Sequence, residues 1–333
     1  MGNTFRPVDV VREYCSKFPT APSKTLARRI IKDHPRLYAN LDCCYYAVQR
    51  VFGVAGERSR KSKSTEAKAL RRPKRNADWA IQDGLSHHSN WGPYILDGVS
   101  RIGILSDIHA PYHNKKELVT AIKTCVADRC DAIVLNGDVC DFYAGSKFMT
   151  DPRKRDLVYE REAVCDILSN IRRALPRARI IFKKGNHDER WFKHICTSCP
   201  DFLDLPELSL EALFRLKEYK VEMIPDRRQI SVEDWNILHG HELGNMYSNP
   251  VGPARTYWTR TMCNTIAGHL HRPDSYTAIS PVTRQMTRVV TSACLCDIYP
   301  DYAPMNGWRH GFVRLDRAKS GRVTIKNLIN DEM

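Results

Sequence analysis

The feature that most constrains the fold is a series of short apolar runs, each of which ends where polar residues begin. Three of them, RIGILS, DAIVLN and RIIFKK, begin at residues 101, 131 and 179. Segments with apolar residues at helical spacing lie between them, around residues 118–126 and 164–171. Strands that alternate with helices form right-handed crossovers, so the pattern predicts a largely parallel sheet. Further strand-like runs after residue 220, with fewer helices between them, indicate a second sheet packed on the first.

Residue types that bind metals follow the ends of five of these runs. The clusters are Asp107-Ile108-His109, Gly137-Asp138-Val139-Cys140-Asp141, Gly185-Asn186-His187-Asp188, His239-Gly240-His241 and Gly268-His269-Leu270-His271. In open α/β sheets, functional residues gather beyond the carboxyl ends of the strands, so we expect these clusters to converge. A single buried histidine is more often a satisfied core residue than a ligand, but five clusters at strand ends favour a metal site.

The donor atoms also predict the kind of metal. Mixed nitrogen and oxygen donors suit Mn, Fe, Zn or Co ions. They do not fit a structural zinc site, which is usually built from cysteine thiolates. There are more donors than one ion needs, so we expect two divalent cations. Mn²⁺ is the preferred metal, with Fe, Zn, Ni, Co or Mg as alternatives. A central carboxylate can bridge two cations about 3.5–4 Å apart, the usual clamp for in-line displacement at phosphorus. We expect the glycines of the clusters to let the backbone turn beside the metals.

The order D-x-H, G-D-x-x-D, G-N-H-D, H-G-H, G-H-x-H resembles the calcineurin-like metallophosphoesterase superfamily over about residues 101–272. The resemblance implies an α/β fold, a four-layer α/β/β/α sandwich with a dinuclear site between the sheets. It implies a ligand set for each metal: Asp107, His109 and His271 on one, Asn186, His239 and His269 on the other, and Asp138 bridging both.

The resemblance also implies a mechanism in which a hydroxide that bridges the two metals attacks phosphorus in line. His187 would be the general acid that protonates the leaving oxygen, or would steady the transition state, and Asp141 would orient its imidazole. Arg190 is a candidate for substrate contact. His241 is a candidate either for substrate contact or for supporting a metal ligand, with an ordinary surface or core histidine as the alternative. Asp188 would join the local hydrogen bonding, with a salt bridge to Arg190 as the alternative.

Departures from one branch of the superfamily narrow the expected substrate. The Ser/Thr protein phosphatases have Arg, Glu and Gly where this chain has Phe142, Asp188 and His241, and they lack its complete G-H-x-H. The chain is closer to the nucleases and small phosphodiesterases, and its GNHDERW run and CLCDIYPDY tail resemble bacterial and phage-encoded members of unassigned function. We therefore expect hydrolysis of phosphodiester bonds in nucleic acid or nucleotides. Two alternatives remain. One is a phosphomonoesterase that acts on nucleotides or phosphoproteins, and the other is a nucleic-acid-binding regulatory protein with secondary hydrolytic activity.

The net charge of +14 is concentrated at the N-terminus. Residues 1–76 hold 18 Lys/Arg and 6 Asp/Glu, a net of +12, whereas the other 257 residues carry a net of +2. Residues 1–56 contain three short amphipathic helical patterns, the size of a helix-turn-helix module. Basic side chains on the second helix, Arg28, Arg29 and Lys32, are candidate nucleic-acid contacts. The alternative is a small helical cap with a solvated basic face.

The domain organisation follows from this charge distribution. Residues 57–98 form a basic linker, where Arg71 and Arg72 are further candidate phosphate contacts. Residues 99–333 form the metallophosphoesterase domain. The oligomeric state is not predictable from the sequence.

Cysteine use and hydropathy bear on the compartment. The chain has no run of the ~18–20 apolar residues that a membrane span needs and no signal-peptide core. Its 12 cysteines are too sparse for a disulfide scaffold, so we expect a reduced protein in the cytoplasm, the nucleoid or a host cytosol, without a membrane partner. A zinc site built from Cys196, Cys199, Cys294 and Cys296 is a weaker alternative to four reduced thiols.

Overall fold

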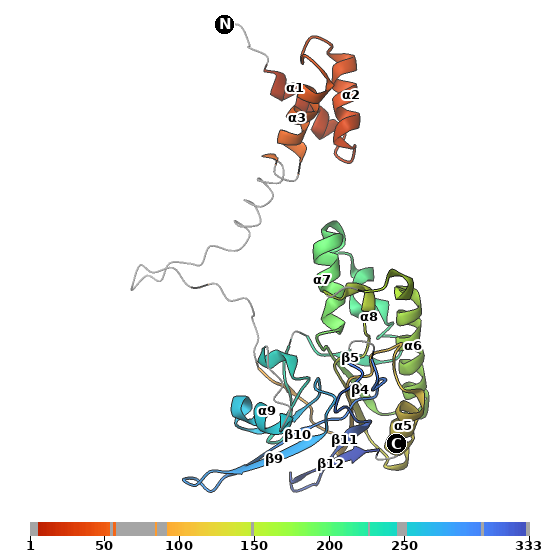
Figure 1. The fold of residues 1–333 in the computed structure, drawn as a ribbon, viewed down its shortest axis with the longest axis vertical. Helices are drawn as coiled ribbons and strands as arrows, with labels where there is room; N and C mark the ends of the chain where they lie inside the picture. The colour runs from red at the N-terminus through yellow and green to blue at the C-terminus, as the bar shows by residue number, and fades with distance from the viewer. Residues whose placement is uncertain are drawn as a thin grey trace. The chain divides into compact units, whose positions relative to one another are not determined.

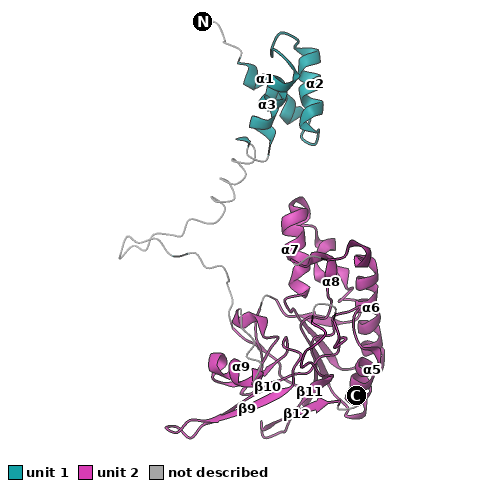
Figure 2. Ribbon diagram, in the orientation of Figure 1, with its two compact units in different colours: residues 1–89 teal, residues 90–333 magenta. Residues whose placement is uncertain are grey.

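The computed structural model describes residues 6–53, 56–57, 84, 92–147, 150–225, 227–244, 252–300 and 303–330. The chain divides into two compact units, residues 1–89 and 90–333 (Figure 2). Arg71 and Arg72 lie outside the described residues. No helix in the described ranges combines the length and apolarity that a bilayer crossing requires.

The first unit contains the helices α1 (Pro7–Lys17), α2 (Ser23–Asp33) and α3 (Leu41–Phe52). Each helix turns one apolar face inward, and Val11, Ile30 and Val48 lie at the centre of a shared core with no exposed surface. The Asn40 side chain starts α3 by accepting the Cys43 N–H at 2.9 Å. The predicted helical N-terminal region is therefore confirmed.

The first sheet of the second unit runs in the order β12-β11-β2-β3-β4-β5. Its strands are Val323–Ile329, Gly311–Arg317, Arg101–Leu105, Ala132–Asn136, Arg179–Lys183 and Val221–Met223. Strands β2 to β5 are parallel, as the alternating pattern predicts, and β11 and β12 extend the sheet in antiparallel pairing. The three apolar runs of the sequence are the three central parallel strands.

The second sheet runs in the order β1-β6-β7-β8-β10-β9. Its strands are Tyr94–Ile95, Ile230–Val232, Trp235–Leu238, Asn264–Ala267, Met286–Thr291 and Asp274–Ile279. Strand β1 lies within the segment that the sequence assigns to a linker, and it pairs in parallel with β6. Neither of these two strands was predicted, because both are too short to show an alternating pattern.

The two sheets and their helices form four layers, which confirms the predicted sandwich. Apolar side chains of both sheets, such as Ile104, Val134 and Ile266, meet in one buried core. The helices α5 (Lys115–Ala127) and α6 (Leu157–Ala174) cover the outer face of the first sheet, and α9 (Pro253–Thr261) covers that of the second (Figure 1).

The remaining helices are short and follow the strands that carry the polar clusters. They are the α-helices α7 (Asp188–Ser198) and α8 (Leu210–Leu213) and the 3-10 helices η1 (Tyr143–Gly145), η2 (Pro152–Lys154), η3 (Pro200–Phe202), η4 (Pro206–Leu208) and η5 (His241–Leu243). The clusters follow parallel strands in both sheets: β2, β3 and β4 in the first, and β7 and β8 in the second. The carboxyl ends of these strands meet at one edge of the sandwich. The five clusters lie at this edge.

Candidate metal centre

Five of the seven predicted ligands have a left-handed backbone. The φ angle is 57° at Asp107, 50° at His109, 51° at Asp138, 70° at His269 and 57° at His271. For a residue with a Cβ atom this conformation costs about 1–3 kcal/mol, and such strain gathers at functional sites. The strain aims the side chains of three separate loops at one point.

Asp107, His109 and His271 form one half of the centre. His271 Nε2 lies 3.2 Å from Asp107 Oδ1 and 3.3 Å from His109 Nε2. All three side chains are buried. The Asp107 carboxylate also accepts the backbone N–H of His269 at 2.9 Å, which ties the G-H-L-H loop to the D-I-H loop.

Asp138, Asn186, His239 and His269 form the other half. His239 Nε2 lies 3.2 Å from Asp138 Oδ2 and 3.3 Å from Asn186 Oδ1. Donor atoms of Asp138, His239 and His269 lie within 4.8 Å of one another. Asp138 Oδ2 is also 3.7 Å from His109 Nε2, so this carboxylate faces both halves, as a bridging ligand must.

Glycines make this close approach possible. A Cβ atom at Gly185 would lie 2.2 Å from Asp138 Oδ1 and 2.3 Å from the Asp138 backbone nitrogen. Gly137 has a φ of 84°, and a Cβ atom there would lie 2.3 Å from His239 Nδ1. Neither position has room for another residue, as the sequence predicts.

The charges of the centre fit divalent cations. Asp107 and Asp138 are 0% and 1% exposed, and among the described residues neither pairs with a lysine or an arginine. Burial opposes ionisation, but the surrounding histidines lower the pKa of both carboxyl groups. Against the cost of burial, the Asp138 carboxylate raises the pKa of His239 to about 10. Buried carboxylates and imidazole nitrogens that face one another at about 3 Å are a donor set for a cation, which would take the place of the proton that His239 otherwise shares with Asp138.

Asp141 lies between a predicted ligand and the predicted acid. Its Oδ1 atom is 2.9 Å from His187 Nδ1 and 2.9 Å from His109 Nδ1. Burial works in the opposite direction, but these two rings lower the pKa of Asp141. The sequence predicted the contact with His187 and missed the contact with His109.

Arg190 lies over the other edge of His187. Its Nη2 atom is 2.9 Å from His187 Nε2, and its Nη1 atom donates to the Asp141 carbonyl at 3.0 Å. The alternative salt bridge from Asp188 to Arg190 is wrong. The buried Asp188 carboxylate instead accepts the backbone N–H groups of Gly185 at 2.8 Å and Cys140 at 3.1 Å, which joins two of the loops.

His241 is held beside the centre by an acidic residue. Its Nε2 atom lies 3.1 Å from Glu189 Oε1, and its ring packs on that of His239 with centroids 5.2 Å apart. Glu189 also accepts two hydrogen bonds of 2.7 Å from Arg227. The sequence analysis missed Glu189 and Arg227. Glu189 stands in the GNHDERW run, but nothing in that run assigns it a partner, and Arg227 stands in none of the motifs.

A buried ion pair supports the H-G-H loop. Lys183 has no exposed surface, and its Nζ atom lies 2.7 Å from Glu242 Oε1 and donates to the Arg228 carbonyl at 2.7 Å. Glu242 in turn accepts the backbone N–H groups of His239 at 3.0 Å and Gly240 at 2.6 Å. The signal for this pair was a lysine inside an apolar run, which the sequence analysis assigned to the end of a strand.

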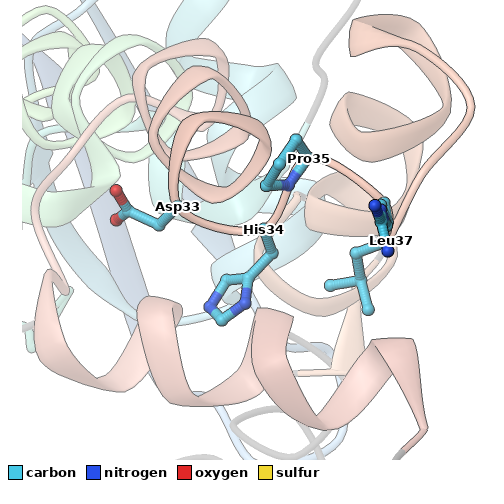
Figure 3. Close-up of a pocket in the computed structure, with 5 residues that line it drawn as sticks. Asp33, His34, Pro35 and Leu37 are labelled. Atoms are coloured by element: carbon cyan, nitrogen blue, oxygen red, sulfur yellow. The ribbon is translucent and has the colours of Figure 1, made fainter.

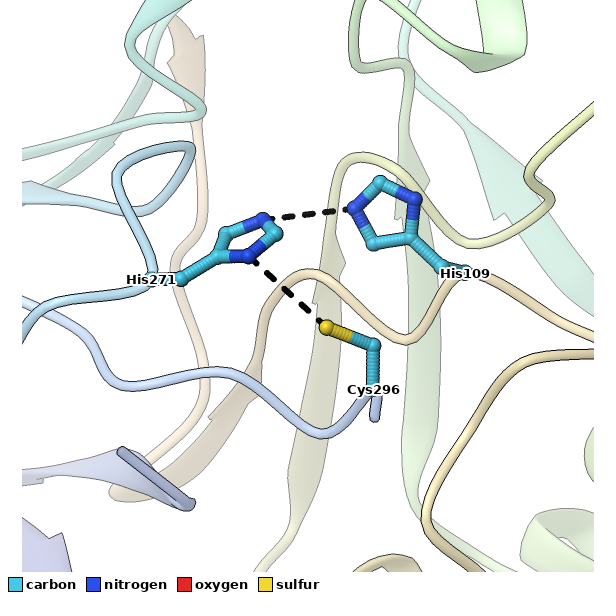
Figure 4. A group of neighbouring side chains, drawn as sticks. All are labelled: His109, His271 and Cys296. Atoms are coloured by element: carbon cyan, nitrogen blue, oxygen red, sulfur yellow. Dashed lines mark hydrogen bonds between the residues drawn. The ribbon is translucent and has the colours of Figure 1, made fainter. Parts of the chain in front are cut away.

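The cysteines do not assemble the alternative zinc site. Cys196 and Cys199 are exposed on and just after α7, whereas Cys294 and Cys296 are buried. Among the described residues, no candidate metal cluster includes Cys196 or Cys199. Cys296 instead lies beside His271 in the centre itself (Figure 4).

The predicted nucleic-acid contacts of the first unit lie on one helix. Arg28, Arg29 and Lys32 are all exposed on α2, and the Arg29 guanidinium also lies 4.4 Å from the centroid of the Phe18 ring. A separate hollow follows the end of this helix (Figure 3). It is lined by Asp33, His34, Pro35, Arg36 and Leu37. The three basic side chains are thus exposed on one helix, and the mixed lining of the hollow does not indicate a ligand.

Comparison with known proteins relates the second unit to a family. Residues 100–273 match the family described as Calcineurin-like phosphoesterase. The Gene 54 proteins of Mycobacterium phages D29 and L5 are each 23% identical to this chain, over 178 and 180 residues. Each match spans 52% of this chain and 69% of the phage protein.

The solved structures that match this chain have lower sequence identity to it. Vacuolar Protein Sorting 29 from Cryptosporidium parvum aligns over 70% of this chain and 99% of its own, with 12% identity and a TM-score of 0.35. YfcE, a phosphoesterase from E. coli, aligns over 68% of this chain and 99% of its own, with 14% identity and a TM-score of 0.32.

Proposed function

The chain belongs to the calcineurin-like phosphoesterase family, and from this premise we propose that it hydrolyses phosphodiester bonds of nucleic acid or nucleotides. One observation carries the proposal. Seven oxygen and nitrogen donors from five loops converge at one edge of the sandwich, and five of them do so through a strained backbone. A stability cost of this kind persists where a function requires the geometry.

Two divalent cations would occupy the two halves of the centre. Asp107, His109 and His271 would hold one, Asn186, His239 and His269 the other, and Asp138 would contact both. When bound, the cations would lower the pKa of a water molecule and neutralise the phosphate oxygens. The donor atoms include no thiolate, which favours Mn²⁺ or Fe over a structural zinc ion.

His187 and Arg190 would act on the substrate beside the cations. The contact of Asp141 with His187 Nδ1 holds a proton at that atom, and Nε2 then faces Arg190. If a phosphate oxygen of the substrate bound the Arg190 guanidinium, the contact between Arg190 and His187 Nε2 would be broken. His187 could then take a proton from solvent at Nε2 and give it to the leaving oxygen, with Asp141 stabilising the charged ring.

The basic face of α2 supports a polymeric substrate. Arg28, Arg29 and Lys32 would neutralise phosphates of a nucleic acid, so binding should weaken steeply as salt increases. The helix-turn-helix assignment would place the third helix on DNA, but α3 carries only Arg50 as a basic residue and Asp42 offsets it. We therefore propose α2 as the main phosphate-contacting helix.

Hydrolysis in the presence of Mn²⁺ tests the proposed chemistry. The full chain should hydrolyse bis-p-nitrophenyl phosphate, and Asp138→Ala should abolish the activity. His187→Ala should lower turnover by about 10²–10⁴-fold on substrates with a poor leaving group and by much less on p-nitrophenyl esters, because only the former need a general acid. Full activity of both variants would refute the assignment.

A substrate panel tests the proposed substrate class. It compares single-stranded DNA, duplex DNA, RNA, cyclic nucleotides and a phosphomonoester. Replacing Arg28, Arg29 and Lys32 with glutamine should weaken nucleic-acid binding and reduce its salt slope, with small diesters unaffected. Neutralising Lys115, Lys116 and Lys123 on α5 is the matched control. Equal binding by both triple variants, or turnover of the monoester alone, would contradict the proposal.

A further inference from the structure

The two ring nitrogens of His271 face different partners. Nε2 points to the centre, 3.2 Å from Asp107 Oδ1 and 3.3 Å from His109 Nε2. Nδ1 points away from it, 3.7 Å from the sulfur of Cys296 (Figure 4). The sulfur lies within 4.8 Å of donor atoms of both His109 and His271. An imidazole can present only one nitrogen to a given ion, so when Nε2 binds the cation, Nδ1 is left to meet the sulfur.

Two other histidines of the centre have an acceptor at the same position. His109 Nδ1 lies 2.9 Å from Asp141 Oδ1, and His239 Nδ1 lies 2.8 Å from the Asn136 carbonyl oxygen. A histidine that binds a metal through one nitrogen donates the other N–H to such a partner, which fixes the tautomer and the ring orientation. In the described part of the chain, the polar atom that His271 Nδ1 meets is the Cys296 sulfur.

The backbone around Cys296 is fixed to the loop that carries Asp107 and His109. Leu295 donates to the Asp107 carbonyl at 3.1 Å and accepts the Asn114 N–H at 2.8 Å. On the next residue, the Cys296 carbonyl lies 2.9 Å from His310 Nε2. The side chain is only 3% exposed, so neither solvent nor a rotamer change easily removes the sulfur from the ring.

An aromatic side chain completes the environment of this ring. The Trp308 indole packs edge-on against His271, with ring centroids 4.0 Å apart. The ring is therefore held on one edge by the sulfur and on a face by the indole, while Nε2 stays directed at the centre.

We propose that Cys296 is a positioning residue whose sulfur accepts the Nδ1–H of His271 and thereby keeps Nε2 available to the cation that Asp107 and His109 also hold. This inference rests on the proposed function, because it needs a cation in that half. Sulfur is a weak acceptor, so its effect should lie near the lower end of the 10–100-fold range in metal affinity found for such outer partners, about 10-fold.

Calorimetric titration of the full chain with Mn²⁺ provides the test. The wild type should bind two cations. Cys296→Ala should weaken one of them about 10-fold and leave the other unchanged, and Cys296→Ser, which restores an acceptor, should return the affinity to within a few-fold. Cys165→Ala, which removes a buried thiol from α6, is the matched control and should bind both cations normally. Cys296→Val replaces the alanine variant if that variant does not fold.

The absorption spectrum of the Co²⁺-loaded wild type separates a positioning role from direct ligation. We expect no sulfur-to-cobalt charge-transfer band. A band that disappears in Cys296→Ser would overturn the proposal, because the thiolate would then be a ligand. Unchanged Mn²⁺ affinity in Cys296→Ala would overturn it as well. Failure of the wild type to bind any cation would instead refute the proposed function, so the two failures are distinguishable.

Discussion

Replacing Lys183 with methionine should both destabilise the protein and weaken its metal centre. The lysine has no exposed surface and lies 2.7 Å from Glu242, which is itself buried and holds the backbone of the H-G-H loop. Removing one partner of a buried pair leaves an uncompensated charge and costs about 3–5 kcal/mol.

The pKa of Glu242 gives an independent magnitude. Burial opposes ionisation, but Lys183 and the neighbouring histidines lower the pKa from 4.5 to about 2. At roughly 1.36 kcal/mol per pKa unit, this corresponds to about 3 kcal/mol. A lowered pKa contributes stability that is present above pH 4.5 and is lost as the pH falls toward 2. This part of the acid dependence should become smaller in Lys183→Met, because only the contribution of the histidines remains.

Urea unfolding of a double-mutant cycle measures the pair. Lys183→Met should lose about 3–5 kcal/mol, and Lys183→Met combined with Glu242→Gln should recover most of it, because the second change removes the unpaired charge. Calorimetry on Lys183→Met should find weaker Mn²⁺ binding at His239, because the Glu242 carboxylate that accepts the His239 backbone N–H is no longer held by the lysine. A loss below about 1 kcal/mol in the single variant, or a double variant as unstable as the single one, would refute the reasoning.

Three further predictions concern the centre and its surroundings. Gly185→Ala should abolish Mn²⁺ binding in calorimetry, since its Cβ atom would overlap the Asp138 backbone; normal binding would show that the loops are not packed as described. Burial, followed by Asp141, raises the pKa of Glu160 to about 7, so unfolding stability should fall as the pH rises from 4.5 to 7. Glu160→Gln should remove that fall and gain about 1–3 kcal/mol at pH 8, and an unchanged pH profile would contradict it. A cation present at 100 times its Kd should stabilise the protein by about 2.7 kcal/mol. Chelation with EDTA should remove this stabilisation and lower the melting temperature, and an unchanged melting temperature would argue against a bound metal.

The sequence predicted the framework of the second unit because its signals are local. Apolar runs such as 131–136 became central strands, and the polar clusters that follow them meet at one edge because parallel strands place their carboxyl ends together. Periodicity did not reveal β1 and β6, strands of two and three residues that pair with each other although partners such as Tyr94 and Ile230 lie 136 positions apart in the sequence.

The residues that support the site were harder to predict because their partners are distant in the chain. Lys183 and Glu242 are 59 positions apart, and only the fold shows that a lysine in an apolar run meets a carboxylate. The same holds for Cys296 beside His271, which sequence alone placed in a possible zinc set. Asp188 was a plausible partner for Arg190 by spacing, but burial directs its carboxylate to backbone N–H groups instead.

The most direct test of the account is anomalous diffraction from crystals grown with Mn²⁺. We predict two peaks about 3.5–4 Å apart at the edge where the five loops meet. One should be bound by Asp107 and His271 and the other by Asn186 and His239, with Asp138 between them. A single peak, or none at these residues, would contradict the central claim that this strained set of donors is a dinuclear centre.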